Sequence, residues 1–150
     1  MQTAFNKDLP LAIGADHAGY EYKEAIKQWL TEQGWNVSDK GTHGPDSVDY
    51  PDYAHPTASM VEKGEAGVGI LICGSANGVC ITANKHQGIR AALCWNADVA
   101  SLARQHNDAN IIGLPARFVS LEEAKQMVSI FLSTAFEGGR HQNRVDKISC

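Results

Sequence analysis

The chain has 150 residues, of which 43% are hydrophobic and 20% charged, so we expect one globular domain over residues 1–150 and exclude a disordered protein. A formal net charge of −4 gives no overall basic surface for nucleic acid or for an anionic membrane. The N-terminal segment lacks an apolar core, and no apolar run approaches the length of a transmembrane helix, so we expect a cytoplasmic protein that does not bind membranes.

The first part of the chain alternates between strand and helix patterns. A strand is predicted over residues 9–14 and a helix from Tyr20, where apolar residues recur at helical spacing until Gly34 ends the pattern. A short second strand is predicted over residues 35–39. The segment 40–56, with three prolines and two glycines, is expected to be a loop that covers a site, followed by a helix to about residue 63.

The rest of the chain continues the alternation. Further strands are predicted over residues 68–73, 88–94 and 110–114. One helix begins at Val79, and Asn96 caps another that runs to about His106. Ser120 and Glu123 have the spacing of a capping box ahead of an apolar helical stripe. This order predicts an α/β fold, a Rossmann-like three-layer sandwich with a five-stranded parallel sheet and helices on both faces.

The most informative stretch is the apolar run that ends at Cys73, followed by small residues as far as Gly78. Small residues let the backbone turn sharply and approach a ligand, and the helix that follows offers N–H groups to an anion. Cys73 is either a small buried hydrophobe or a thiol whose thiolate is stabilised by these groups, as a nucleophile or base requires. Its position at the carboxyl end of a parallel strand favours the second interpretation.

Asp16 and His17 follow the first predicted strand and should meet the Cys73 loop, because loops after neighbouring parallel strands converge. An equally good alternative is that Asp16 only caps the next helix. A dinucleotide site is a competing prediction, since Asp39 has the position of a ribose-binding acid. However, Asp16 puts a carboxylate where that motif needs a glycine beside the pyrophosphate, which argues against it.

The polar tail of residues 137–150 carries Arg140, His141 and Arg144. If the tail is helical, the two arginines share one face and suit a phosphate group, which guanidinium binds in a bidentate manner. The alternative is an ordinary solvated surface.

The remaining cysteines and histidines give weaker signals. The four cysteines form neither a C-x-x-C pair nor the spacing of a zinc site, so we expect reduced thiols, with Cys80 as a packing residue. His43, His55 and His86 are expected to be surface or loop residues.

Six segments span nearly the whole chain in order: IGADHAG at Ile13–Gly19, DYPDYA at Asp49–Ala54, ILICGSANG at Ile70–Gly78, ANKHQGIRAALC at Ala83–Cys94, RQHNDANI at Arg104–Ile111 and EGGRHQNRV at Glu137–Val145. Together they closely resemble the ribose-5-phosphate isomerase B family, and such a set is more specific than any one motif. The wider family also includes isomerases of galactose 6-phosphate and allose 6-phosphate.

The resemblance implies an aldose–ketose isomerase that uses no metal or cofactor and interconverts D-ribose 5-phosphate and D-ribulose 5-phosphate through an enediolate. By the same resemblance, Cys73 is the base, His106 donates a proton in ring opening and Asp16 acts at the sugar hydroxyls. Ser75 is a further catalytic residue, and the backbone N–H groups of its loop stabilise the oxyanion. The expected substrate contacts, besides Asp16 and Ser75, are His17, Tyr50, Gly74, Ala76, Asn77, Gly78, Asn107, Arg117, Arg140 and Arg144.

Two departures from the family pattern matter for this loop. Some members use a glutamate where this chain has Val79, so Cys73 is the only base of the two present. The middle of the loop is usually glycine, and Ala76 disfavours a positive φ, which puts the oxyanion contacts in question.

The resemblance also implies a homodimer, or a tetramer of paired dimers, with each active site built from both subunits. His106 and the tail of about residues 137–150 would then reach the partner's Cys73. Two alternatives for the function stay open. One is an isomerase of a six-carbon sugar phosphate, since pocket shape decides the substrate. The other, less favoured, is a non-catalytic module that binds sugar phosphates or nucleotides and is stabilised by them without turnover.

Overall fold

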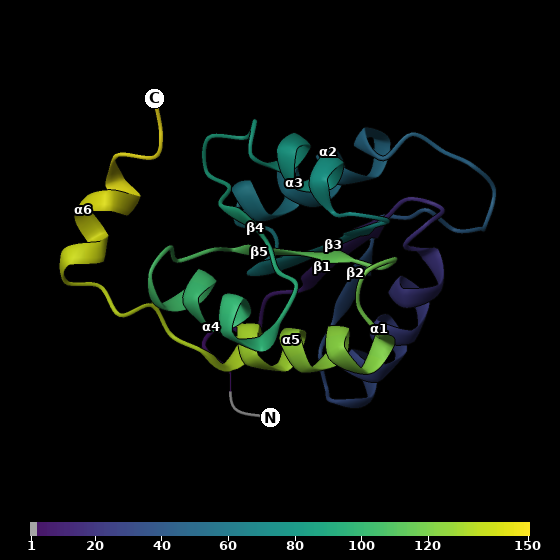
Figure 1. Ribbon diagram of the computed structural model, residues 1–150, viewed down its shortest axis with the longest axis horizontal. Helices are drawn as coiled ribbons and strands as arrows, with labels where there is room; N and C mark the ends of the chain where they lie inside the picture. Colours follow the sequence, from purple (N-terminus) through teal and green to yellow (C-terminus); the bar gives the residue numbers. More distant parts are fainter. Residues whose placement is uncertain (1–2) are drawn as a thin grey trace.

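Five parallel strands form the centre of the computed structural model, which describes residues 3–150 (Figure 1). Their order across the sheet is β2-β1-β3-β5-β4, which confirms the predicted fold class. The strands are β1 (Leu11–Ala15), β2 (Val37–Asp39), β3 (Val68–Cys73), β4 (Ala91–Leu93) and β5 (Ile111–Pro115). The helices are α1 (Tyr20–Glu32), α2 (Pro51–Glu62), α3 (Asn77–Ala83), α4 (Ala97–Gln105), α5 (Leu121–Ser133) and α6 (Arg140–Asp146).

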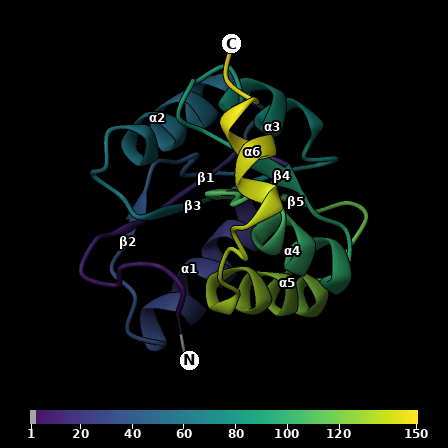
Figure 2. The same ribbon diagram turned by 90° about the vertical axis from the view of Figure 1, so that its left-hand side faces the viewer.

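Helices cover both faces of the sheet. Helices α2 and α3 lie on one face, and α1, α4 and α5 on the other, as Figures 1 and 2 show from two sides. Side chains alternate along each strand, so Leu11 and Ile13 of β1 join the hydrophobic cluster that includes α1, α4 and α5, whereas Ala12 joins the one that includes α2 and α3. Burial on both faces explains the unbroken apolar runs of β1, β3 and β5.

Helix α2 corrects the prediction that residues 40–56 are a loop. The helix begins at Pro51, because the first helical position needs no N–H donor and proline already has the right φ. Pro56 lies inside the second turn, where it removes one backbone hydrogen bond without ending the helix. The loop is therefore shorter and covers residues 40–50.

Other boundaries differ less from those predicted. Helix α3 begins at Asn77, slightly before Val79, and β4 is shorter than the predicted strand. The capping box of α5 is present: Ser120 Oγ accepts a hydrogen bond from the Glu123 N–H, and Glu123 Oε1 accepts one from the Ser120 N–H. Part of the tail forms α6, so the condition under which Arg140 and Arg144 share one face is met. Within residues 3–150, no helix combines the length and apolarity that crossing a membrane needs.

A buried lysine joins α1 to the end of β2. Lys23 is 0% exposed, and its Nζ lies 2.6 Å from Asp39 Oδ2, which also accepts a hydrogen bond from Lys27 Nζ at 2.8 Å. Burial alone would raise the pKa of Asp39, but hydrogen bonds from Lys23, Lys27 and the Gly41 N–H outweigh burial and keep this pKa below its usual 3.8. Asp39 is thus a carboxylate shared by two ammonium groups.

We expect Asp39→Asn to lower the free energy of unfolding by about 3 kcal/mol at pH 7, because it leaves the buried ammonium of Lys23 without its main counter-ion. Urea unfolding measures this loss. The control is Glu122→Gln, which removes an exposed ion pair with Lys125 and should cost under about 1 kcal/mol. Equal losses in the two variants would contradict the role of Asp39.

The same contact predicts a pH dependence. Because folding lowers the pKa of Asp39, its stabilising contribution is complete above about pH 4 and is lost as the pH falls through the folded-state value. The free energy of unfolding of the Asn variant should therefore fall less between pH 5 and acid conditions than that of the unaltered protein. Parallel curves for the two proteins would show that Asp39 does not couple protonation to stability.

Candidate active site

The carboxyl ends of β1, β3 and β5 bring three loops to one edge of the sheet. Strand β3 ends at Cys73, which pairs with Pro115 at the end of β5. Backbone hydrogen bonds join the loops: the Ala116 N–H donates to Cys73 O at 2.9 Å, and the Asp16 N–H donates to Ile72 O at 3.3 Å. This edge is where open parallel sheets bind their ligands.

A cavity of about 470 Å³ opens where these loops meet, a volume typical of small-molecule sites. It is lined by Asp16, His17, Ala18, Tyr50, Cys73, Gly74, Ser75, Gly78, Arg117 and Phe118. The structure thus brings together eight of the residues that the sequence analysis selected, from loops far apart in the chain. The predicted meeting of Asp16 and His17 with the Cys73 loop is present.

The four cysteines are free thiols in different surroundings. Cys73 reaches the cavity at the end of β3, although only 5% of its surface is exposed. Burial raises the pKa of Cys80 to about 12 and that of Cys94 to about 12, so both stay protonated and unreactive at neutral pH. Cys150 is exposed at the end of the chain.

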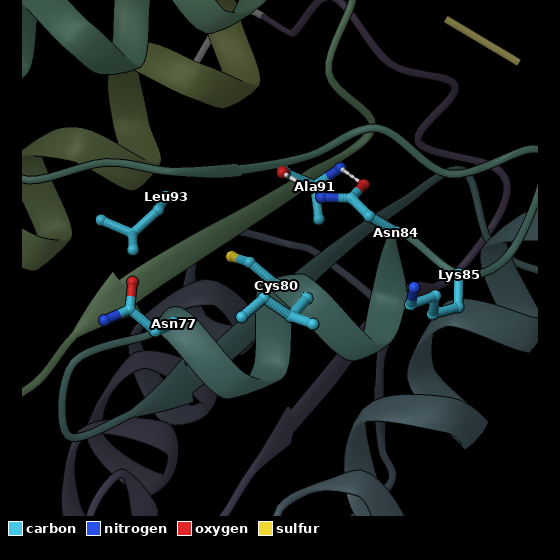
Figure 3. A pocket seen from close by; sticks show the side chains of 7 residues that line it. Asn77, Cys80, Asn84, Lys85, Ala91 and Leu93 are labelled. Carbon is cyan, nitrogen blue, oxygen red and sulfur yellow. Dashed lines mark hydrogen bonds between the residues drawn. The ribbon is translucent and has the colours of Figure 1, made fainter.

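A separate cavity of about 490 Å³ lies between α3 and β4, where Figure 3 shows Cys80 and Asn77 among the lining side chains. Asn84 Nδ2 donates to Ala91 O at 3.0 Å, and Asn84 Oδ1 accepts from the Ala91 N–H at 2.8 Å, which ties the end of α3 to β4. Asn77, a predicted substrate contact, therefore lines this cavity and not that of Cys73. Cys80 packs against β5, since a Cβ on Gly113 would lie on its sulfur.

The loop between β3 and α3 has one unusual conformation. Ala76 adopts the left-handed region with φ 65° and ψ −1°, which glycine adopts without strain and which costs alanine about 1 kcal/mol. Ser75 Oγ accepts a hydrogen bond from the Asn77 N–H at 3.3 Å. Ser75 lines the cavity and its N–H donates to no group within residues 3–150, so it is available to a ligand, whereas Ala76 is fully buried and does not line the cavity.

Asp16 and His17 each use one side-chain atom for structure and keep another free. Asp16 Oδ1 accepts hydrogen bonds from the N–H groups of Ala18 and Gly19, at 2.9 and 3.1 Å, so it closes the turn before α1 but does not cap the helix, whose N-cap is Gly19. His17 Nδ1 accepts from the Val48 N–H at 3.2 Å, which puts the proton of the neutral ring on Nε2. Because both residues also line the cavity, structural and ligand roles are compatible.

Tyr50 and Arg117 approach the cavity over glycines. A Cβ on Gly78 would lie 2.5 Å from the Tyr50 ring, and one on Gly74 would lie 3.2 Å from Arg117 Nη1. Glycine at these positions therefore admits a phenol and a guanidinium group to the cavity wall. The sequence analysis missed Phe118, which is 74% exposed and lines the cavity; an exposed aromatic residue directly after Arg117 was the available signal.

Four predicted site residues lie elsewhere in the chain. His106 ends α4 and stacks on His141, while Asn107 lines a different cavity near β4. Arg140 and Arg144 belong to α6, which lies at the opposite end of the molecule from the loop before α2 (Figure 1). Within one chain, none of these four residues lines the cavity of Cys73.

The nucleotide alternative finds no support at Asp39. Its Oδ2 already accepts from Lys23 and Lys27, and its Oδ1 accepts from the Gly41 N–H at 2.9 Å. A ribose would have to compete with two ammonium groups for this carboxylate.

Fold and site together define an α/β protein with a small-molecule cavity at the carboxyl ends of its parallel strands. Residues 11–148 match the family model described as Ribose/Galactose Isomerase, and the chain belongs to this family. It is thus an isomerase, as the sequence analysis predicts.

Relatives cover nearly the whole chain. Ribose-5-phosphate isomerase B of Escherichia coli is 47% identical over 93% of this chain and 93% of its own length. A crystal structure of a ribose 5-phosphate isomerase from Thermotoga maritima has a TM-score of 0.92 and 49% identity, and covers 94% of this chain and 97% of that one. The enzyme of Mycoplasma genitalium with bound ribulose-5-phosphate has a TM-score of 0.92 and 43% identity, with 95% of each chain covered.

We expect thiol-specific alkylation of the native protein at pH 8 to modify Cys150 first and Cys73 next. Cys80 and Cys94 should stay unmodified, because a pKa of about 12 leaves about one thiolate in 10⁴ at this pH and both side chains are buried. Peptide mass mapping over time measures the order. Unfolding the protein in urea is the control and should make all four thiols reactive. Early labelling of Cys80 would contradict this assignment.

Proposed function

We propose that the protein interconverts D-ribose 5-phosphate and D-ribulose 5-phosphate through an enediolate, with Cys73 as the base. The observation that carries this proposal is the meeting in one cavity of the Cys73 thiol, the Arg117 guanidinium group and the Ser75 N–H, which has no partner within residues 3–150. The identity of 47% to an enzyme named ribose-5-phosphate isomerase B supports the choice of substrate.

The chemistry explains why these groups belong together. A proton next to a carbonyl group is weakly acidic, so its removal needs a positioned base and stabilisation of the oxygen that gains charge. Cys73 removes the proton from C2 and returns it to C1. The N–H group of Ser75 donates to the developing oxyanion, and the left-handed conformation of Ala76 turns the backbone into α3 directly after it.

The other cavity residues bind the sugar. Asp16 Oδ2 and His17 Nε2–H are free to bind hydroxyl groups. The backbone N–H groups nearby donate instead to the other polar atom of each side chain, Asp16 Oδ1 and His17 Nδ1. Tyr50 and Arg117 extend the polar wall, and Arg117 adds a positive charge for an anionic substrate.

The residues outside the cavity are supplied by a second copy of the chain. The 150 residues form one isomerase domain, and two copies of it form a homodimer. Each active site contains residues of both subunits, and His106 and Asn107 act on the sugar bound in the cavity of the other subunit. Arg140 and Arg144 are exposed and form no ion pair with any other residue from 3 to 150, so they can bind phosphate. Exposed apolar side chains that a second copy could bury are Ile81, Trp95, Leu102 and Ile148.

We expect Cys73→Ala to lower kcat for ribose 5-phosphate by about 10² to 10⁴, the usual cost of a missing general base, while the fold remains. Cys80→Ala is the matched control, since it removes a thiol in the helix that follows the Cys73 loop and this thiol stays protonated; its kcat should change less than about threefold. Turnover should be the same with and without EDTA. Full activity of Cys73→Ala would remove Cys73 as the base.

The substrate is tested by the same assay. Ribose 5-phosphate should have a higher kcat/KM than allose 6-phosphate or galactose 6-phosphate. Preference for a six-carbon substrate would contradict the proposed substrate and favour an isomerase of a six-carbon sugar phosphate. Thermal stabilisation by all three sugars without any turnover would favour the binding-module alternative.

Sharing of active sites predicts complementation between inactive variants. Cys73→Ala and His106→Asn should each be nearly inactive, but an equal mixture that is unfolded and refolded together should recover about a quarter of the parental activity. The reason is that half of the dimers are mixed, and one of the two sites in each mixed dimer has both residues intact. A mixture no more active than its components would contradict shared sites.

A further inference from the structure

Three side chains form a cluster at the junction of α4 and the C-terminal tail, outside the cavity of Cys73. His106 ends α4, Glu137 lies between α5 and α6, and His141 is in the first turn of α6. Glu137 Oε1 is 3.5 Å from His141 Nε2 and 3.9 Å from His106 Nε2. One donor atom of each residue lies within 4.8 Å of the other two.

The backbone holds this cluster together. The Glu137 N–H donates to Gln105 O at 3.1 Å, which keeps the carboxylate beside the end of α4. His141 is buried, and its ring stacks on that of His106 with the centroids 4.2 Å apart. Glu137 and His106 are partly exposed, so an ion from solution can reach the donor atoms.

We propose that the cluster of His106, Glu137 and His141 binds a divalent transition-metal cation of the zinc type. Two imidazole nitrogens and one carboxylate oxygen are a donor set that holds zinc and leaves its fourth position to water. At metal–ligand distances of about 2.0–2.2 Å, a tetrahedral site separates its donors by about 3.3–3.5 Å. The contact between Glu137 and His141 already has this length, 3.5 Å.

Coordination needs one local movement. The two imidazole rings are stacked with an angle of only 15° between their planes, so their Nε2 lone pairs lie in nearly parallel planes and do not converge. The partly exposed His106 ring can turn about its χ2 torsion, which is soft for an sp³–sp² bond, and bring its Nε2 toward Glu137.

The surrounding charges act in both directions. Burial lowers the pKa of His141, and the neighbouring His106 and Arg140 lower it further. Glu137 supplies one negative charge. Arg140 and Arg144 on the same helix oppose a cation, and we therefore expect moderate affinity rather than a permanently loaded site.

A second histidine cluster shows why donor direction matters. His86 Nε2 contacts His55 Nδ1 at 2.8 Å, whereas His86 Nδ1 contacts Glu62 Oε1 at 3.2 Å. The two nitrogens of His86 point to opposite sides of its ring, so the three residues cannot converge on one ion. This cluster has the same residue types and serves as an internal control.

The consequence rests on the proposed function, in which His106 transfers a proton. A bound cation occupies His106 Nε2, so that this nitrogen can no longer carry the proton for this step, and it joins α6, with Arg140 and Arg144, to the end of α4. Zinc should therefore inhibit an isomerase that itself works without metal.

Binding is tested by calorimetric titration of Zn²⁺ into the full chain after EDTA treatment, in a Cys150→Ser background that removes the exposed thiol. We expect one ion per chain, with affinity at least about tenfold weaker in Glu137→Gln and in His141→Ala. His55→Ala, the control from the second cluster, should bind as the parent does. Glu137 is 51% exposed, so its variant should fold normally. Unchanged affinity in Glu137→Gln, or no binding at all, would overturn the site.

Inhibition is tested separately with ribose 5-phosphate as substrate. Zinc at saturating concentration should abolish most parental turnover but leave that of Glu137→Gln much less affected. Binding with full activity would overturn the inhibitory role while the metal site stands. Absence of parental turnover without zinc would instead count against the proposed function, and the calorimetric result would still decide the site.

Discussion

The parallel pairing of β3 with β1 and β5 is the constraint on which the rest of the structure depends. Its register puts Cys73 opposite Pro115, so the loops after all three strands leave the sheet at the same edge. Buried clusters on both faces hold this register, because a slip of one residue would exchange the two sets of side chains. The composition of the cavity therefore follows from the order of the strands more than from any preference of the loops.

Close backbone approach is the second condition for the site. A Cβ on Gly19 would lie 2.5 Å from Ile72 O, so glycine allows the start of α1 to come against β3 just before Cys73. Gly78 does the same for the Tyr50 ring. In these loops, glycine leaves room both for a ligand and for close contact between segments, because it has no side chain. Polar side chains such as Asp16, His17 and Arg117 then line the cavity.

The fold could be predicted because its main strands are buried on both faces, where an apolar run such as that before Cys73 permits few alternatives. The capping box could be predicted for a different reason: both of its hydrogen bonds join Ser120 and Glu123, which are close in the sequence. The start of α2 at Pro51 could not be predicted from the sequence, because proline is common both in loops and at first helical positions. Local pattern also does not encode the distance of His106 from the cavity or the left-handed Ala76, which the tertiary surroundings impose.

Helix α6 differs from every other helix in that neither hydrophobic cluster of residues 3–150 includes any of its side chains. The packing of the sheet therefore places little demand on the sequence of this segment. A gene that lost the codons after residue 136 would still encode both clusters and the Cys73 cavity, but without the two exposed arginines.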